Sequence, residues 1–230
     1  MMLRELISIF KAANPLGKMG DNFAKMLSLT QDQTIRAGQI FFSKPPSPEE
    51  RTQIYKQDVK VNKLERKIRK QVIAHLSIGG NSADVPYSLL LMSLVKDVER
   101  IGDYAKNLAE TLDVAGGVTL PDDEMVAELG EIRAEVETLF EAVAEVFARS
   151  DEEEAVELIR QGRDLTHRCD ALIGRVAGSE YNADTTTAVV MGIRFYKRIG
   201  AHLLNVLSGI VMPLHKLDYY DEKALKQPRG

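Results

Sequence analysis

Four oxygen-bearing side chains have the types and the spacing of a metal site. Asp58 and Asn62 form one pair and Glu99 and Asp103 the other, and the members of each pair are four residues apart. On a helix, residues four apart lie one above the other on the same face. Their carboxylate and amide oxygens suit Mg, Mn, Fe or Zn, and the charge of such an ion relieves the repulsion between clustered carboxylates.

Both pairs are predicted to lie beside a packing seam. In the stretch 48–77, Asp58 and Asn62 fall at the edge of the apolar stripe rather than opposite it. In the stretch 83–113, Glu99 falls only about 40° beyond the apolar stripe when residues are placed at helical spacing. Two helices that each place oxygen ligands one turn apart, beside their seam, can converge on one cation.

Two more residues of the stretch 83–113 carry expectations. Asp97 is expected to point closer to the polar side of its helix. Gly102 lies inside the same helix, where glycine costs about 1 kcal/mol relative to alanine. A glycine at such a position indicates that a neighbouring backbone or side chain approaches closely.

An alternative interpretation makes the four residues ordinary boundary residues that form salt bridges, for example with Lys106 or Arg100. Catalytic chemistry is not indicated. A ferritin-type di-iron centre requires Glu-x-x-His on paired helices, and the histidines supply only Asp164-x-x-His167. We find no glycine-rich phosphate loop and no Gly-x-Ser-x-Gly elbow. We therefore expect a protein that is not an enzyme.

The fold class predicted for these 230 residues is all-α. Prolines, glycines and N-cap residues punctuate the chain, with Ser47 and Glu50 spaced for a capping box. No segment alternates with period two. Short loops between long helices favour up-down antiparallel bundles. Six long helices are expected after a short N-terminal one, at 21–42, 48–77, 83–113, 122–149, 151–177 and 184–212.

An internal repeat divides the chain into two halves. A shift of 98 residues places Glu99-Arg-Ile-Gly-Asp103 over Lys197-Arg-Ile-Gly-Ala201, and a shift of 104 residues places Ser47 over Asp151. The halves are therefore predicted to be copies of one three-helix unit. The expected organisation is an amphipathic N-terminal segment, two three-helix bundles and a C-terminal tail, at 1–18, 19–117, 118–214 and 215–230.

Charge and composition limit the kinds of partner and the cell compartment that we expect for this protein. The net charge of −4 argues against nonspecific nucleic-acid binding, which depends on clustered lysine and arginine. One basic stretch, 60–70, is either a solvated face or a docking patch for an acidic partner or an anionic lipid surface. No apolar run approaches the roughly 18–20 residues that cross a bilayer. With a single cysteine, Cys169, and no secretion signal, we expect a cytoplasmic protein.

Two segments together resemble the paired motif of the PhoU family of phosphate-uptake regulators. They are Asp58-Val-Lys-Val-Asn62-Lys-Leu-Glu65 and Asp97-Val-Glu-Arg-Ile-Gly-Asp-Tyr-Ala-Lys-Asn107. The resemblance implies two similar, spectrin-like three-helix bundles and a cytoplasmic regulator without catalysis of its own. It also implies metal ligands at Asp58, Asn62, Glu99 and Asp103, and contacts at the inner membrane face with a phosphate transporter, such as an ABC-type one, and with a sensor kinase. The divergence of the second copy, described next, adds a sodium-coupled phosphate carrier as a candidate partner.

The second copy departs from this pattern. Its four ligand positions are Gly162, Thr166, Lys197 and Ala201, none of which is a carboxylate. A divalent or ferric metal is therefore expected in the first bundle only.

Two functions from different classes remain open at the level of sequence. One is a regulator of phosphate transport and phosphate homeostasis, and the other is a helical adaptor with no metal or phosphate role. The sequence also leaves open whether the protein is a homodimer.

Overall fold

The computed structural model describes residues 15–42, 47–78 and 80–218. Helix is the only regular secondary structure in these ranges, as predicted. The long helices are α2 (Pro15–Phe42), α3 (Pro48–Leu76), α4 (Val85–Val114), α5 (Glu124–Arg149), α6 (Glu152–Ala177) and α7 (Ala183–Val211). Two short 3₁₀ turns, η2 (Ser82–Asp84) and η3 (Leu214–Lys216), precede α4 and follow α7.

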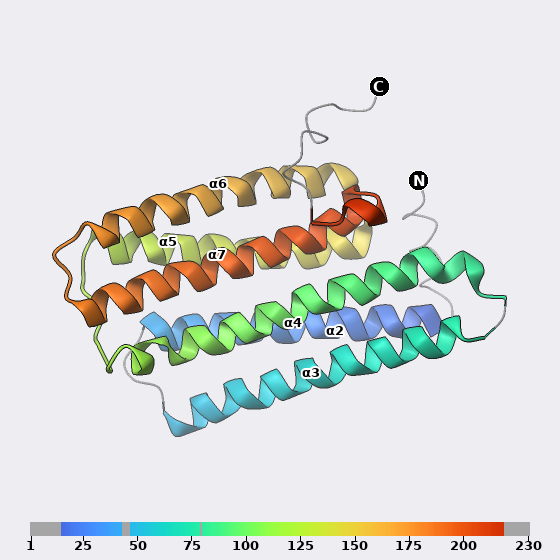
Figure 1. Cartoon of the computed structure of the whole chain (residues 1–230), viewed down its shortest axis with the longest axis horizontal. Helices are drawn as coiled ribbons and strands as arrows, with labels where there is room; N and C mark the ends of the chain where they lie inside the picture. Colours follow the sequence, from blue (N-terminus) through green and yellow to red (C-terminus); the bar gives the residue numbers. More distant parts are fainter. Residues whose placement is uncertain (1–14, 43–46, 79, 219–230) are drawn as a thin grey trace.

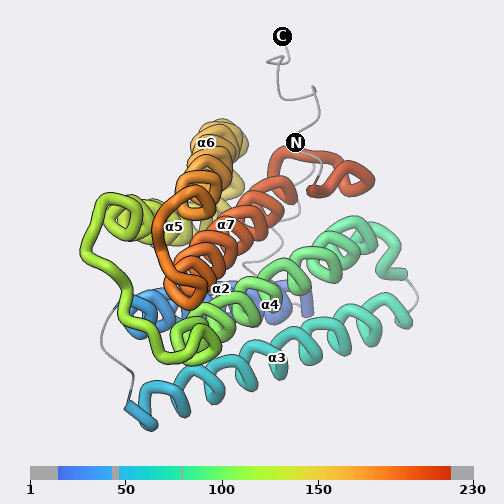
Figure 2. Tube along the Cα trace, turned by 60° about the vertical axis from the view of Figure 1, so that its left-hand side comes forward, coloured from blue at the N-terminus to red at the C-terminus, as the bar shows by residue number. Residues whose placement is uncertain are grey.

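The six helices form two antiparallel three-helix bundles, which confirms the predicted fold class (Figure 1). The first bundle contains α2, α3 and α4, and the second contains α5, α6 and α7. The bundles meet mainly where α4 packs along α7, and α2 also contacts α5. Figure 2 shows α3 and α6 at opposite outer edges of the molecule, with α4 and α7 between them.

Helix starts follow from N-cap side chains that satisfy the free backbone N–H groups of the first turn. The capping box predicted at α3 is confirmed, because the Glu50 N–H donates to Ser47 Oγ (3.2 Å) and the Ser47 N–H donates to Glu50 Oε2 (2.7 Å). At the starts of α5, α6 and α7, the N-cap side chain accepts from a backbone N–H of the first turn. These N-cap residues are Asp123, Asp151 and Asn182.

Helix α2 begins at Pro15, six positions before its predicted start, so it runs through the expected segment boundary at residue 18. Leu16 and Met19 explain the extension, since both are buried and continue the apolar stripe toward Phe23. The predicted N-terminal helix before Pro15 and most of the predicted C-terminal tail, from residue 219 onward, lie outside the described residues. No helix in the described part of the chain is long and apolar enough to cross a membrane.

A buried polar cluster joins the two bundles. Asp97 on α4 is only 8% exposed, and its Oδ1 accepts hydrogen bonds from His202 Nδ1 (2.8 Å) and Asn205 Nδ2 (2.7 Å) on α7. The His202 ring stacks on Tyr104, with centroids 5.6 Å apart. The sequence predicts that Asp97 points closer to the polar side of its helix, away from the core. This prediction is wrong, because α7 packs on that side of α4 and buries Asp97.

The contacts across this interface follow the spacing of the repeat. Asp97 and Phe195 are 98 positions apart, as are Tyr104 and His202. Asp97 contacts His202, while Phe195 lies against Tyr104 with ring centroids 6.1 Å apart. The contact between Asp97 and His202 and the contact between Tyr104 and Phe195 therefore join equivalent positions of the two halves, in opposite order. This is the arrangement expected when two related halves pack face to face.

We predict that Asp97→Ala lowers the free energy of unfolding by about 1–3 kcal/mol, because it leaves two partly buried polar groups, on His202 and Asn205, without their acceptor. Chemical denaturation followed by circular dichroism measures this change. Asp164→Ala, which removes an exposed carboxylate from α6, is the control and should change stability by less than about 0.5 kcal/mol. Equal effects of the two substitutions would contradict the structural role given to Asp97.

Candidate functional site

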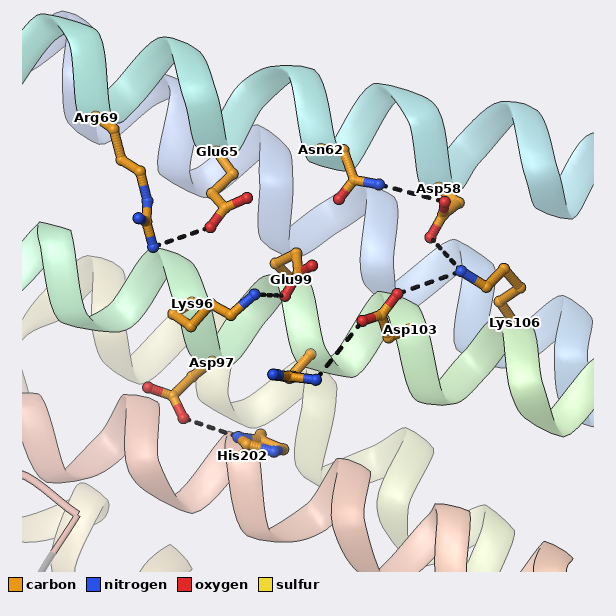
Figure 3. A network of polar contacts seen from close by, with 11 residues as sticks. Asp58, Asn62, Glu65, Arg69, Lys96, Asp97, Glu99, Asp103, Lys106 and His202 are labelled. Atoms are coloured by element: carbon orange, nitrogen blue, oxygen red, sulfur yellow. Dashed lines mark hydrogen bonds and ion pairs between the residues drawn. The ribbon is translucent and has the colours of Figure 1, made fainter.

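The structure brings the four predicted ligand residues to facing sides of α3 and α4. Asp58 and Asn62 project from α3, and Glu99 and Asp103 from α4 (Figure 3). The three carboxylates are close enough to influence one another. Burial raises the pKa of Asp58, the Lys106 ammonium opposes this rise, and the negative charges of Asp103 and Glu99 add to it. We call this row of charged and polar side chains between α3 and α4 the acidic seam.

Lys106 lies between the two carboxylates at one end of the acidic seam. Its Nζ is 3.5 Å from Asp58 Oδ1 on α3 and 3.3 Å from Asp103 Oδ1 on α4. Burial lowers the pKa of Lys106, but the charges of Asp58 and Asp103 outweigh this effect and hold the pKa above its ordinary value. The ammonium is therefore charged at neutral pH and links the two helices.

Other cations of the protein pair with the remaining acids of the seam. Lys96 pairs with Glu99, and Arg100 lies 3.9 Å from Asp103. Asn62 turns its amide nitrogen toward Asp58 and donates to Oδ2 at 3.3 Å. Ion pairs with Lys106 and Arg100, which the alternative interpretation named, are therefore present, and the predicted metal site stays a prediction.

Sequence reasoning did not assign Glu65 and Arg69 to this site. They extend the acidic seam along α3, with Arg69 Nη2 and Glu65 Oε1 3.0 Å apart (Figure 3). The signal was present in the spacing, because Glu65 follows Asn62 by three residues and so shares its side of the helix.

The residue types of the seam fit a hard metal ion, but their oxygens do not converge on one point in this structure. A carboxylate cluster holds a cation when its oxygens converge on one point. Within the described ranges, no group of three or more His, Cys, Asp or Glu side chains is placed to do so. Asn62 presents nitrogen rather than oxygen to Asp58, and Lys106 occupies the space between Asp58 and Asp103. The protein's own ammonium provides the charge compensation that a metal would provide.

Gly102 has the close neighbour that the sequence predicted. A Cβ at this position would lie 3.3 Å from Gln33 Oε1 of α2. Gln33 is fully buried, and its Nε2 donates to the Gly102 carbonyl at 3.2 Å. The glycine therefore lets α2 pack directly behind the turn of α4 that carries Glu99 and Asp103.

The second bundle replaces the charged pair by an apolar contact. Gly162 corresponds to Asp58 in the repeat, and Leu204 corresponds to Lys106. A Cβ at Gly162 would lie 2.5 Å from Leu204 Cδ2, so the leucine fills the space that a larger side chain would need. Where the first bundle has a partly buried ion pair at its seam, the second buries a leucine methyl group against the backbone of Gly162.

Lys197, the counterpart of Glu99, is also engaged. Its Nζ lies 2.5 and 2.6 Å from the two carboxylate oxygens of Asp170 on α6. The seam of the second bundle is thus closed by one lysine–aspartate pair and by apolar packing. Although the second copy lacks the acids of the first, Lys197 at its seam is therefore paired with Asp170.

Comparison with known proteins now bears on this geometry. Residues 23–112 match the family model described as the PhoU domain, and these residues include every member of the acidic seam. The part of the chain that carries the acidic seam is therefore similar to a PhoU domain. The match covers the first bundle, the half that retains the acids.

Comparison with curated proteins gives a similar result. A curated relative, the phosphate-specific transport system accessory protein PhoU homolog 1 of Thermotoga maritima, is 29% identical over 129 residues. That alignment covers 47% of this chain and 55% of the relative, or about half the length of each.

Two solved structures share the fold. The PhoU structure from Pseudomonas aeruginosa superposes with a TM-score of 0.76 at 19% identity, covering 85% of this chain and 95% of the other. The phosphate transport system regulatory protein PhoU from Streptococcus pneumoniae gives a TM-score of 0.73 at 16% identity, covering 92% and 97%. At these identities the likeness extends to the fold of both bundles.

We predict that Lys106→Met raises the affinity of the acidic seam for a divalent ion by about tenfold or more, because it removes a positive charge beside two carboxylates. Titration calorimetry with Mn²⁺ and Zn²⁺ measures the affinity, and metal analysis of the purified proteins measures the content. The variant Glu99→Ala/Asp103→Ala should hold the least metal.

The matched control is Lys197→Met, which makes the same charge change in the second bundle and should leave metal affinity as in the wild type. If Lys106→Met and the wild type bind Mn²⁺ and Zn²⁺ equally well, the ammonium does not compete for the site. If the wild type holds no more metal than Glu99→Ala/Asp103→Ala, the predicted metal ligands are wrong.

Proposed function

We propose that this protein regulates phosphate transport and phosphate homeostasis by binding a membrane transporter or a sensor protein. The observation that carries the proposal is the PhoU-domain match over residues 23–112, which coincides with the three-helix bundle that holds the acidic seam. The names of the relatives support it, since the Thermotoga maritima protein is an accessory of phosphate-specific transport and the Streptococcus pneumoniae protein is a phosphate transport regulator.

The proposed partners lie at the inner face of the membrane. They are a phosphate transporter, either ABC-type or sodium-coupled, and a sensor kinase. Because the two bundles differ so much at their seams, we propose that they meet different surfaces. The first bundle has partly exposed acids at its seam, whereas the second has the Lys197–Asp170 pair at its seam and the buried Leu204 beneath it. In this proposal the protein acts from the cytoplasm and catalyses no reaction.

A metal ion at the four predicted ligands remains a separate proposal. The regulatory role does not depend on it, because Lys106 already bridges the acids of α3 and α4. Loss of metal and loss of regulation can therefore be observed independently.

The second candidate function is a helical adaptor without a role in phosphate handling. One observation favours it: most cations of the basic stretch 60–70 on α3 are exposed and lie outside the seam, where they offer a separate binding surface. The two candidates differ in what happens to phosphate when the gene is deleted.

We predict that deletion of the gene raises phosphate uptake or accumulation, because a repressing regulator is lost, and that the wild-type gene restores both. Uptake of radiolabelled phosphate and total cell phosphate measure the effect. The variant Glu99→Ala/Asp103→Ala should restore them incompletely, because these substitutions remove both predicted α4 ligands and break the Lys106 bridge to Asp103.

Glu131→Ala/Glu135→Ala is the matched control, since these exposed acids pair with Arg168 in the second bundle and their loss makes the same charge change. It should restore phosphate uptake fully. A deletion strain with unchanged uptake and unchanged accumulation would contradict the regulatory role and favour the adaptor.

A further inference from the structure

Between Lys56 and Lys70, the outward face of α3 carries six exposed cations and no exposed acid. Helix α3 packs on α2 and α4 and leaves its opposite side to solvent, at the outer edge of the molecule (Figures 1 and 2). We call its six exposed cations the basic ridge. They are Lys56, Lys60, Lys63, Arg66, Lys67 and Lys70.

The acids of this part of α3 do not neutralise the ridge. Asp58 and Glu65 turn into the acidic seam, where their side chains are 14% and 13% exposed. Lys67 donates to Asn22 Oδ1 at 3.1 Å, a neutral partner on α2. None of the six cations forms an ion pair with a residue in the described ranges. The ridge therefore presents uncompensated positive charge to solvent.

The spacing makes the ridge long and straight. Lys70 follows Lys56 by 14 positions, which corresponds to a rise of about 21 Å along an α-helix. The central part borders an open groove, lined by Lys63, Arg66, Lys67, Lys70, Gln71 and Ala74. The groove is open to solvent rather than enclosed, so the ridge suits an extended surface better than an enclosed small ligand.

Apolar side chains accompany the cations. Val59 is 48% exposed and Ile73 is 60% exposed, and each lies within one helical turn of a ridge cation. Exposed apolar residues beside clustered lysine and arginine are typical of helices that lie on anionic membranes, where the cations attract lipid phosphates and the apolar groups enter the interface.

We propose that the basic ridge binds the surface of a bilayer that contains anionic phospholipids. The lysine and arginine side chains recognise lipid phosphate groups, and Val59 and Ile73 contact the interface. This orientation directs the second bundle away from the bilayer, because α6 lies at the edge opposite α3 (Figure 2). The proposal goes beyond regulation of phosphate transport and holds whether or not the protein affects phosphate uptake.

The test is binding of the full-length protein to vesicles of phosphatidylglycerol and phosphatidylcholine, compared with vesicles of phosphatidylcholine alone. The wild type should bind the anionic vesicles, bind them less as salt increases, and leave the neutral vesicles unbound. The variant Lys60→Gln/Lys63→Gln/Arg66→Gln/Lys70→Gln should bind at least about 100-fold more weakly, since each cation near an anionic surface contributes to affinity. Lys67 is kept because it holds Asn22.

A control variant removes the same amount of charge from other helices. Lys25→Gln/Arg36→Gln/Arg194→Gln/Arg198→Gln replaces four exposed cations of α2 and α7 and should retain nearly all the affinity. Thermal unfolding followed by circular dichroism should show both variants folded, because the replaced side chains are exposed.

Three results would overturn the proposal. The wild type could fail to bind anionic vesicles, the ridge variant could bind as well as the control variant, or the ridge could bind soluble polyphosphate or an acidic peptide while leaving vesicles unbound. A phosphate-uptake defect on gene deletion, combined with absent vesicle binding, would mean that this inference fails while the proposed function stands.

Discussion

The packing of α4 against both bundles is the constraint on which the rest of the structure depends. One side of α4 lies against α2, another against α7 and a third against α3. A helix in this position is apolar over most of its circumference, and Leu91, Leu94, Val98 and Ile101 are fully buried. The acids in the middle of α4 then lie in two places. Asp97 is hydrogen-bonded at the interface with α7, and Glu99 and Asp103 lie at the border with α3, where the acidic seam runs.

The same constraint explains how the two halves diverged. At the border of α4 with α3, a carboxylate is tolerated because Lys106 lies within 3.5 Å of it. The corresponding border in the second bundle has lost both groups together, with Gly162 and Leu204 in their places. Loss of one partner alone would have left a partly buried charge unpaired, which is costly. The paired loss therefore changed the chemistry of the seam without changing the fold.

Local signals in the sequence were sufficient for the helices and for the neighbourhood of the site. Caps and helix breakers placed the loops, and four-residue spacing placed Asp58 and Asn62 opposite Glu99 and Asp103. Asp97 could not be placed in this way, because the stripe of one helix does not reveal that a second helix covers its polar side. The pairing of Lys106 with Asp58 was equally hidden, since it depends on how two helices far apart in sequence are aligned along each other. The start of α2 was misplaced because Gly17 and Gly20 are tolerated in a helix whose burial of Leu16 and Met19 outweighs their cost.

Native-state hydrogen exchange measured by mass spectrometry tests most directly whether α4 and α7 form the common core of both bundles. If they do, amides in the middle of α4 and α7 exchange most slowly and at similar rates, because they open only when the whole protein unfolds. Amides of α3 exchange faster, since one side of that helix faces solvent. Slow exchange in α7 together with fast exchange throughout α3 and α4 would mean that the first bundle opens independently, and would contradict the account.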